Sequence, residues 1–135
     1  MTLLGQSAFI YKTANSASIA QNTNTVFDNC TVANAGIYTI SFTARYSGTG
    51  TAIGLQSWIA VTSPVLNQLA LDLVTFPSPY LNIGNGISMS GSWTGLVNAG
   101  AEIKLVGFIQ YSAAPFTGIL LGGAASNYLS VTRIA

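Results

Sequence analysis

The side chains that could carry out acid–base or nucleophilic chemistry are few in this sequence of 135 residues. It contains no histidine, one cysteine, and three carboxylates, Asp28, Asp72 and Glu102. General acid–base catalysis near neutral pH depends most often on histidine, and a glycosidase needs two carboxylates across a cleft. We expect each carboxylate instead to cap a turn or to pair with one of the four basic residues. The sequence therefore predicts a protein that is not an enzyme.

Residues that could hold a ligand or act as a nucleophile are also scarce. Cys30 has no histidine to activate it, so we expect a small buried side chain in a strand that precedes a turn. A structural zinc site of the usual Cys/His kind is excluded, and the phosphate-binding and dinucleotide-binding glycine motifs do not occur. Trp58 and Trp93 are able to stack on sugars, but we expect them to fill a core or an interface. The sequence predicts no catalytic residue, no cofactor and no metal.

Charged side chains make up 5% of the chain, against about a quarter in a typical soluble domain. The exposed surface must therefore consist largely of Ser, Thr, Asn, Gln, Gly and main chain. Such a surface lacks the charge repulsion that keeps proteins apart, and it suits contact with other protein in an oligomer or a larger assembly. The net charge is +1 and the basic residues do not cluster, which argues against a nucleic-acid partner.

The mean hydropathy of +0.51 raises the question of a membrane segment. The most apolar run, residues 118–125, is rich in glycine and shorter than the roughly 20 residues of a spanning helix. Residues 1–7 have neither the basic nor the apolar region of a secretory signal peptide. We therefore expect no membrane partner and no export by the general secretory route.

Alternating apolar and polar residues, interrupted by clusters of Gly, Asn, Pro and Ser, predict β-strands throughout. Turns are expected at residues 33–36, 47–51 and 98–100, and a loop over 76–86. We predict a single all-β domain, residues 1–135, built as an antiparallel β-sandwich of about eight strands, a jelly roll. The expected strands are 8–12, 25–32, 37–46, 53–61, 69–73, 87–93, 102–111 and 128–134, and the clearest apolar face is formed by Tyr38, Ile40, Phe42, Ala44 and Tyr46.

The expected strand over 102–111 has apolar residues on both faces. Ile103, Leu105 and Ile109 belong to the core face, whereas Val106 and Phe108 lie on the second face beside charged residues. These two side chains are either scattered surface hydrophobes, which are common, or part of a subunit interface. We favour the interface, because the low charge of the chain points the same way.

Three segments resemble the C1q/tumour necrosis factor superfamily in their order and spacing. Gly36-Ile-Tyr-Thr-Ile-Ser-Phe42, with Phe27-Asp28-Asn29 upstream, resembles the Gly-x-Tyr-x-hydrophobic strand of that family. Residues 95–105 are similar to its leucine, turn, Gly-Asp and strand segment, and residues 126–134 to its closing strand. The Gly-Asp pair is here Gly100-Ala101-Glu102, and neither calcium-ligand clusters nor a collagen-like stalk occur. The receptor-signalling and calcium-binding roles of animal members therefore gain no support.

The resemblance implies a jelly roll that packs as a homotrimer around a threefold axis. In the family, aromatic and apolar residues of the last strands make the threefold contact. The matching candidates for the trimer interface in this sequence are Met89, Phe108 and Tyr128.

These observations lead to three functional hypotheses. The first is a capsid decoration, or cement, protein of a virus, with a bacteriophage as the virus that we favour. It would be made in the host cytoplasm and would bridge capsomers on the virion through the major capsid protein or another virion protein. The alternatives are the trimeric receptor-binding head of a phage fibre or spike, and a bacterial surface or spore-coat protein of the same fold.

Overall fold

β-Strands account for the regular structure of the described part of the chain. The computed structural model describes residues 7–20, 22–62, 66–82, 86–110 and 116–135. These residues form no helix, so none of them forms a helix long enough to cross a membrane. The strands are β1 (Ser7–Ile10), β2 (Thr25–Thr31), β3 (Gly36–Thr62), β4 (Leu66–Asn82), β5 (Ile87–Val97), β6 (Glu102–Gln110), β7 (Phe116–Leu120) and β8 (Asn127–Arg133).

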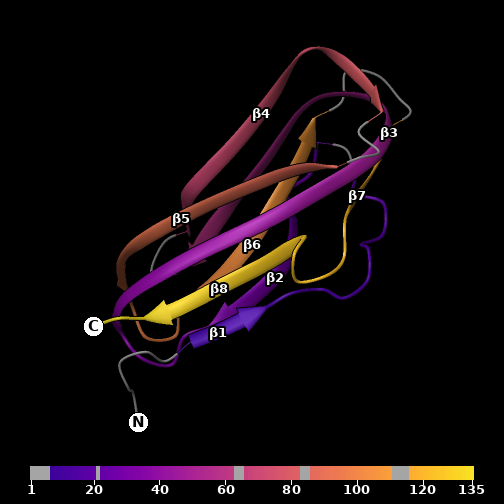
Figure 1. The fold of residues 1–135 in the computed structure, drawn as a ribbon. Coiled ribbons are helices and arrows are strands. Elements are labelled where there is room, and N and C mark those ends of the chain that lie inside the picture. The colour runs from indigo at the N-terminus through magenta and orange to yellow at the C-terminus, as the bar shows by residue number, and fades with distance from the viewer. Residues whose placement is uncertain (1–6, 21, 63–65, 83–85, 111–115) are drawn as a thin grey trace.

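The 27-residue strand β3 belongs to both layers of the sandwich. Its first part, from Gly36 to Tyr46, pairs with β8 and β5, and β1 extends this first sheet beyond β8. Its last part, from Gly54 to Thr62, pairs with β6 and β4, and β2 extends this second sheet beyond β6. Figure 1 shows β3 running along one layer, bending at its far end and returning in the other. The two antiparallel sheets predicted from the sequence are confirmed.

The bend of β3 replaces the turn that we expected at residues 47–51. That prediction was wrong, because Tyr46–Gly50 remain in a β-ladder with β7, which runs antiparallel to them. Strand β7 was not predicted, because its glycine and flanking apolar residues show no alternation. Small residues permit a strand to bend sharply while its main chain stays paired, so the same Gly, Ser and Thr signal fits either structure.

Strand β4 also continues where the sequence predicted a loop. The proline-containing segment 76–80 lies inside β4, so the loop prediction was wrong over those residues. Proline donates no hydrogen bond to a ladder and is tolerated at edges and bulges. The register with β3 shifts at this place, from Ala52 opposite Tyr80 to Gly54 opposite Thr75. The prolines therefore lie in an irregular part of the ladder.

The core lies between the two sheets and uses the predicted inward faces. Strand β3 contributes Tyr38 to Tyr46 on every second residue, as expected, and Asn98–Gly100 form the expected turn, with Gly100 at a φ of 81°. The other buried apolar side chains of this core are Ile19, Phe27, Val32, Leu55, Ile59, Val61, Met89, Val97, Ala101, Ile103, Leu105, Ile109, Leu120, Leu129 and Val131.

One buried hydrogen bond joins the two parts of β3 through the core. The hydroxyl groups of Tyr46 and Ser57 lie 2.6 Å apart, and both residues are fully buried. Gly107 of β6 leaves room for this pair, since a Cβ atom there would collide with the Tyr46 hydroxyl and the Phe27 ring. Each hydroxyl depends on the other, because an unpaired buried hydroxyl carries an uncompensated desolvation cost.

Replacing Tyr46 with phenylalanine should lower the free energy of unfolding by about 1–2 kcal/mol, because the Ser57 hydroxyl loses its partner. Ser57→Ala should cost a similar amount. The double variant should lose less than the sum of the two, which equilibrium denaturation in urea will measure. Strictly additive losses would contradict a direct bond between the two hydroxyls.

Candidate functional site

The outer surface of the first sheet carries a regular array of hydroxyl groups. In β3, β5 and β8 every second side chain points away from the core, and on this surface most of them are Ser or Thr. We call this array the hydroxyl face; its members are Thr39, Ser41, Thr43, Ser88, Ser90, Ser92, Thr94, Ser130 and Thr132. It is the uncharged polar surface that the composition predicted.

The strand register places these hydroxyl residues directly opposite one another. Ser41 of β3 lies opposite Ser92 of β5 and Ser130 of β8. Thr39 lies opposite Thr94, and their hydroxyl oxygens are 3.0 Å apart. Paired hydroxyls across strands stabilise the sheet and still retain acceptor positions for an outside partner.

Aromatic side chains border the hydroxyl face at its β1 edge. Phe9 stacks on Tyr128, with ring centroids 5.1 Å apart, and lies 5.9 Å from Tyr11. Phe9 and Tyr11 are 55% and 42% exposed, although large aromatic rings are usually buried. We call these three residues the aromatic cluster. Of these three residues only Tyr128 was predicted, although Phe9 and Tyr11 lie two residues apart within the expected strand 8–12 and so would share one of its faces.

Met89 does not lie on this surface. It is opposite Ala44 in the ladder between β5 and β3, and both side chains point into the core. Met89 is 1% exposed, so its side chain cannot touch a neighbouring subunit. The prediction of Met89 as an interface residue is corrected for this reason. The residues of β5 that do face outward are its serines and threonine, together with the exposed Leu96.

Phe108 lies on the opposite side of the molecule, on the outer surface of the second sheet. It packs against a separate cluster formed by Trp58, Ala60 and Val106, of which Trp58 and Val106 are cross-strand partners. We call these four residues the outer apolar cluster. Trp58 fills this cluster, and Trp93 packs against the main core, as expected for tryptophans in strands. Phe108 and Tyr128 therefore lie on opposite outer surfaces of the sandwich.

Two ion pairs occur among the described residues, and they differ in burial. Glu102 and Lys104 of β6 form a partly exposed pair, with an N···O distance of 3.0 Å. Lys12 pairs with Asp28 of β2 at 3.6 Å, and the Asp28 side chain is 0% exposed. A β-bulge between Val26 and Asp28 causes this burial, because it turns Phe27 and Asp28 to the same side of β2. The side chain of Asp72 lies outside the described residues.

The environments of Asp28 and Cys30 do not favour nucleophilic or metal chemistry. Burial raises the pKa of the Asp28 carboxyl above its ordinary value of 3.8, and the nearby Lys12 ammonium only partly offsets this effect. Burial also raises the pKa of the Cys30 thiol, so the reactive thiolate is disfavoured. Among the described residues, no group of three or more His, Cys, Asp and Glu side chains gathers to hold a metal ion.

No protein-family model matches this sequence, and no curated protein sequence matches it. Solved structures do resemble the chain. The structure of Eiger TNF from S. frugiperda aligns with a TM-score of 0.62 and 13% sequence identity, over 98% of this chain and 89% of that one. The fold is a TNF-like jelly roll.

A second matching structure is that of a virus particle. A chain in the structure of infectious bursal disease virus, Gx strain, aligns with a TM-score of 0.64 and 13% identity. The alignment covers 96% of this chain and 32% of the viral chain. At this identity the likeness establishes the fold alone. Neither name denotes an enzyme.

Asp28→Asn should change how the stability of the jelly roll depends on pH. The raised pKa means that the folded protein favours protonated Asp28 more than the unfolded chain does. The contribution of Asp28 is therefore complete below its unfolded pKa and is lost as the pH rises through its folded pKa. We expect the free energy of unfolding of the wild type, relative to Asp28→Asn, to decrease from about pH 3 to about pH 7 in urea titrations. An increase over this range would contradict the conclusion that burial has the largest effect on the pKa of Asp28.

Proposed function

We propose that this chain is a structural, non-enzymatic component of a virion, acting as a homotrimeric decoration protein on the capsid surface. The observation that carries the proposal is the aromatic cluster of Phe9, Tyr11 and Tyr128 beside the uncharged hydroxyl face. Exposed aromatic rings next to neutral hydrogen-bonding groups are typical of protein interfaces. The likeness to a chain of a virus particle supports the location.

The trimer contact in this proposal centres on the aromatic cluster. The resemblance to the C1q/tumour necrosis factor superfamily implies a threefold contact made by aromatic residues of the last strands, and Tyr128 lies in β8. Phe9 and Tyr11 enlarge the apolar area around Tyr128. Met89 is buried in the core of its own chain, and this proposal leaves Phe108, which lies on the second sheet, outside the contact.

The rest of the hydroxyl face suits contact with other virion proteins. The nine neutral side chains of this face can exchange hydrogen bonds with a partner, and such bonds are less sensitive to salt than exposed ion pairs are. The low charge of the whole chain, 5% of its residues, makes close approach to a second protein inexpensive in electrostatic terms. A bridge between neighbouring capsomers, with the major capsid protein as partner, fits both properties.

The alternative is a trimeric receptor-binding head of a fibre or spike. The exposure of Phe9 and Tyr11 favours this candidate, because aromatic rings at a surface can stack on the apolar faces of sugars. In a head the cluster would remain open to receptor, whereas in the decoration protein the subunit contact covers it.

The mass in solution tests the trimer. Light scattering on a size-exclusion column should give about 42 kDa, from 3 × 14.0 kDa. Tyr128→Glu should reduce the mass to that of one chain, because the contact would bury an unpaired charge. Phe108→Glu is the matched control and should leave the trimer intact. A wild-type monomer, or dissociation by Phe108→Glu alone, would contradict the proposed contact.

Copy number separates the two virion hypotheses. Quantitative mass spectrometry of purified particles of the virus whose genome encodes this chain should find it in amounts comparable to the major capsid protein. A handful of copies per particle would favour the receptor-binding head. Failure to find the chain in particles would contradict both hypotheses and favour the bacterial surface or coat protein.

A further inference from the structure

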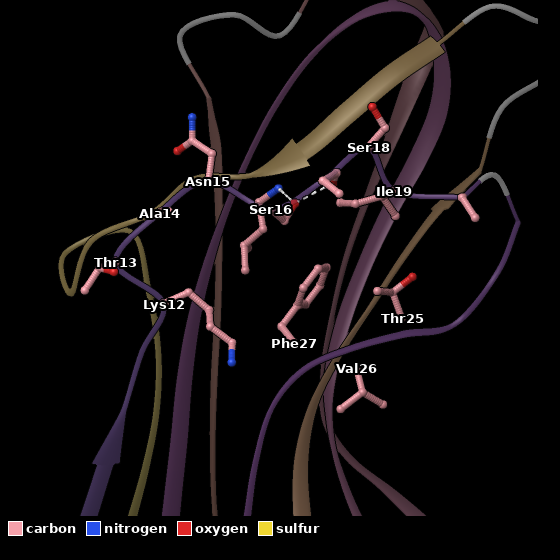
Figure 2. Close-up of a pocket in the computed structure, with 13 residues that line it drawn as sticks. Lys12, Thr13, Ala14, Asn15, Ser16, Ser18, Ile19, Thr25, Val26 and Phe27 are labelled. Carbon is pink, nitrogen blue, oxygen red and sulfur yellow. Dashed lines mark hydrogen bonds between the residues drawn. The ribbon is translucent and has the colours of Figure 1, made fainter.

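A cavity of about 600 Å³ lies between β2 and the segment that precedes it. One wall is the loop over residues 12–20, and the other is formed by residues 25–27 of β2 (Figure 2). Ile19, Phe27 and Leu120 give the cavity an apolar lining, and Lys12 is the charged residue that lines it. Cavities of this size are typical of sites for small ligands.

The loop that forms the outer wall is held in place by its main chain. The N–H groups of Ser16 and Ile19 donate to the carbonyl groups of Leu120 and Gly118, at 2.9 and 2.8 Å. Lys12 exchanges two hydrogen bonds with the buried side chain of Asn127, at 2.8 and 3.1 Å. The wall therefore does not depend on the Lys12 side chain, which is 58% exposed.

The carboxylate of Asp28 is an unsatisfied group one side chain away from this cavity. Its side chain is 0% exposed, and neither carboxylate oxygen accepts a hydrogen bond from the described residues. The Lys12 ammonium stands 3.6 Å away, which is longer than a hydrogen bond between charged groups. A buried carboxylate can accept several hydrogen bonds, so this one retains unused capacity.

Figure 2 shows how these parts lie together: the Lys12 side chain extends from the loop toward β2, beside the ring of Phe27. Asp28 follows Phe27 directly in β2 and contacts the end of the Lys12 side chain. A ligand in the cavity could therefore reach Asp28 by taking the place of the Lys12 ammonium, while the lysine turns into solvent.

We propose that this cavity binds a cationic group carried on an apolar body, with the cation paired to Asp28 and the body against Ile19, Phe27 and Leu120. A guanidinium fits best, because it can donate two parallel hydrogen bonds to one carboxylate and can stack on the Phe27 ring. The cation is either that of a free small molecule or the side chain of an arginine in a partner protein. This inference depends neither on the trimer nor on the virion.

The test uses N-hexylguanidinium as the probe. Its binding to the wild-type protein at neutral pH is measured by two-dimensional NMR. The amide signals of Ser16, Ile19 and Phe27 should shift, and hexanol and hexanoate should bind at least tenfold more weakly. Asp28→Asn should weaken binding of the probe at least tenfold. Glu102→Gln, which removes the carboxylate of the exposed ion pair, is the matched control and should leave binding unchanged.

A second variant should change the affinity for the probe in the opposite direction to Asp28→Asn. Lys12→Met removes the competing ammonium, so the probe should bind severalfold more tightly than it does to the wild type. The probe should also raise the melting temperature of Lys12→Met more than that of the wild type, because it pairs with the Asp28 carboxylate that this variant leaves unpaired. If Lys12→Met does not fold alone, its recovery in the presence of the probe is the expected result. Equal binding of hexylguanidinium and hexanol, or unchanged binding by Asp28→Asn, would overturn the proposal.

A peptide distinguishes the two sources of the cation. In the described part of the chain β2 pairs with β6 on one side, and an extended peptide could pair with its other edge. Acetyl-Val-Arg-Val-amide should bind at least tenfold more tightly than hexylguanidinium if the natural ligand is a protein chain. Equal or weaker binding of the peptide assigns the site to a free small cation.

Discussion

The whole fold depends on β3 being a member of both sheets. Five of the other strands pair with it, and its two parts supply inward side chains to the same core from opposite sides. A shift of one residue in either part would turn its apolar face to solvent. The hydrogen bond between Tyr46 and Ser57 fixes the first part of β3 against its last part inside the core. The strand registers of the two sheets are therefore fixed relative to each other. The positions of the surface residues follow from this register.

Much of the fold follows from alternation in the sequence. The inward face of residues 38–46, the turn at Asn98–Gly100 and the final strand were all predictable, because the strands alternate with a two-residue period and the turn has the sequence Asn-Ala-Gly. The bend of β3 and the prolines of β4 were not predictable, because Gly, Ser, Thr and Pro mark irregular strands as well as turns. Which of these applies depends on whether another strand, such as β7, is there to pair with the main chain.

The candidate sites were less predictable, since they depend on which way each strand faces. The place of Tyr128 in a trimer contact stays a prediction, whereas Met89, which has the same apolar character, points inward because of its pairing with Ala44. Asp28 shows the limit most clearly. In a regular strand the neighbouring residues Phe27 and Asp28 would point to opposite sides. The β-bulge that turns both to the same side of β2 has no recognisable signal in the sequence. The cavity beside them is a property of tertiary structure alone.

The buried side chain of Asn127 has a consequence for how this protein can vary. Its amide bonds to both polar groups of the Lys12 main chain and donates to the carbonyl groups of Leu121 and Gly123. The start of the loop is therefore fixed by a residue that lies outside the loop. Most side chains between residues 13 and 18 are exposed and contribute little to the core. Asn15 and Ser16 are exceptions, because their side-chain oxygens accept hydrogen bonds from the main-chain N–H groups of Gly122 and Leu120. The other positions of this segment can consequently diverge while the scaffold is kept, so that the wall of the cavity can change by natural drift or by library selection at little cost in folding.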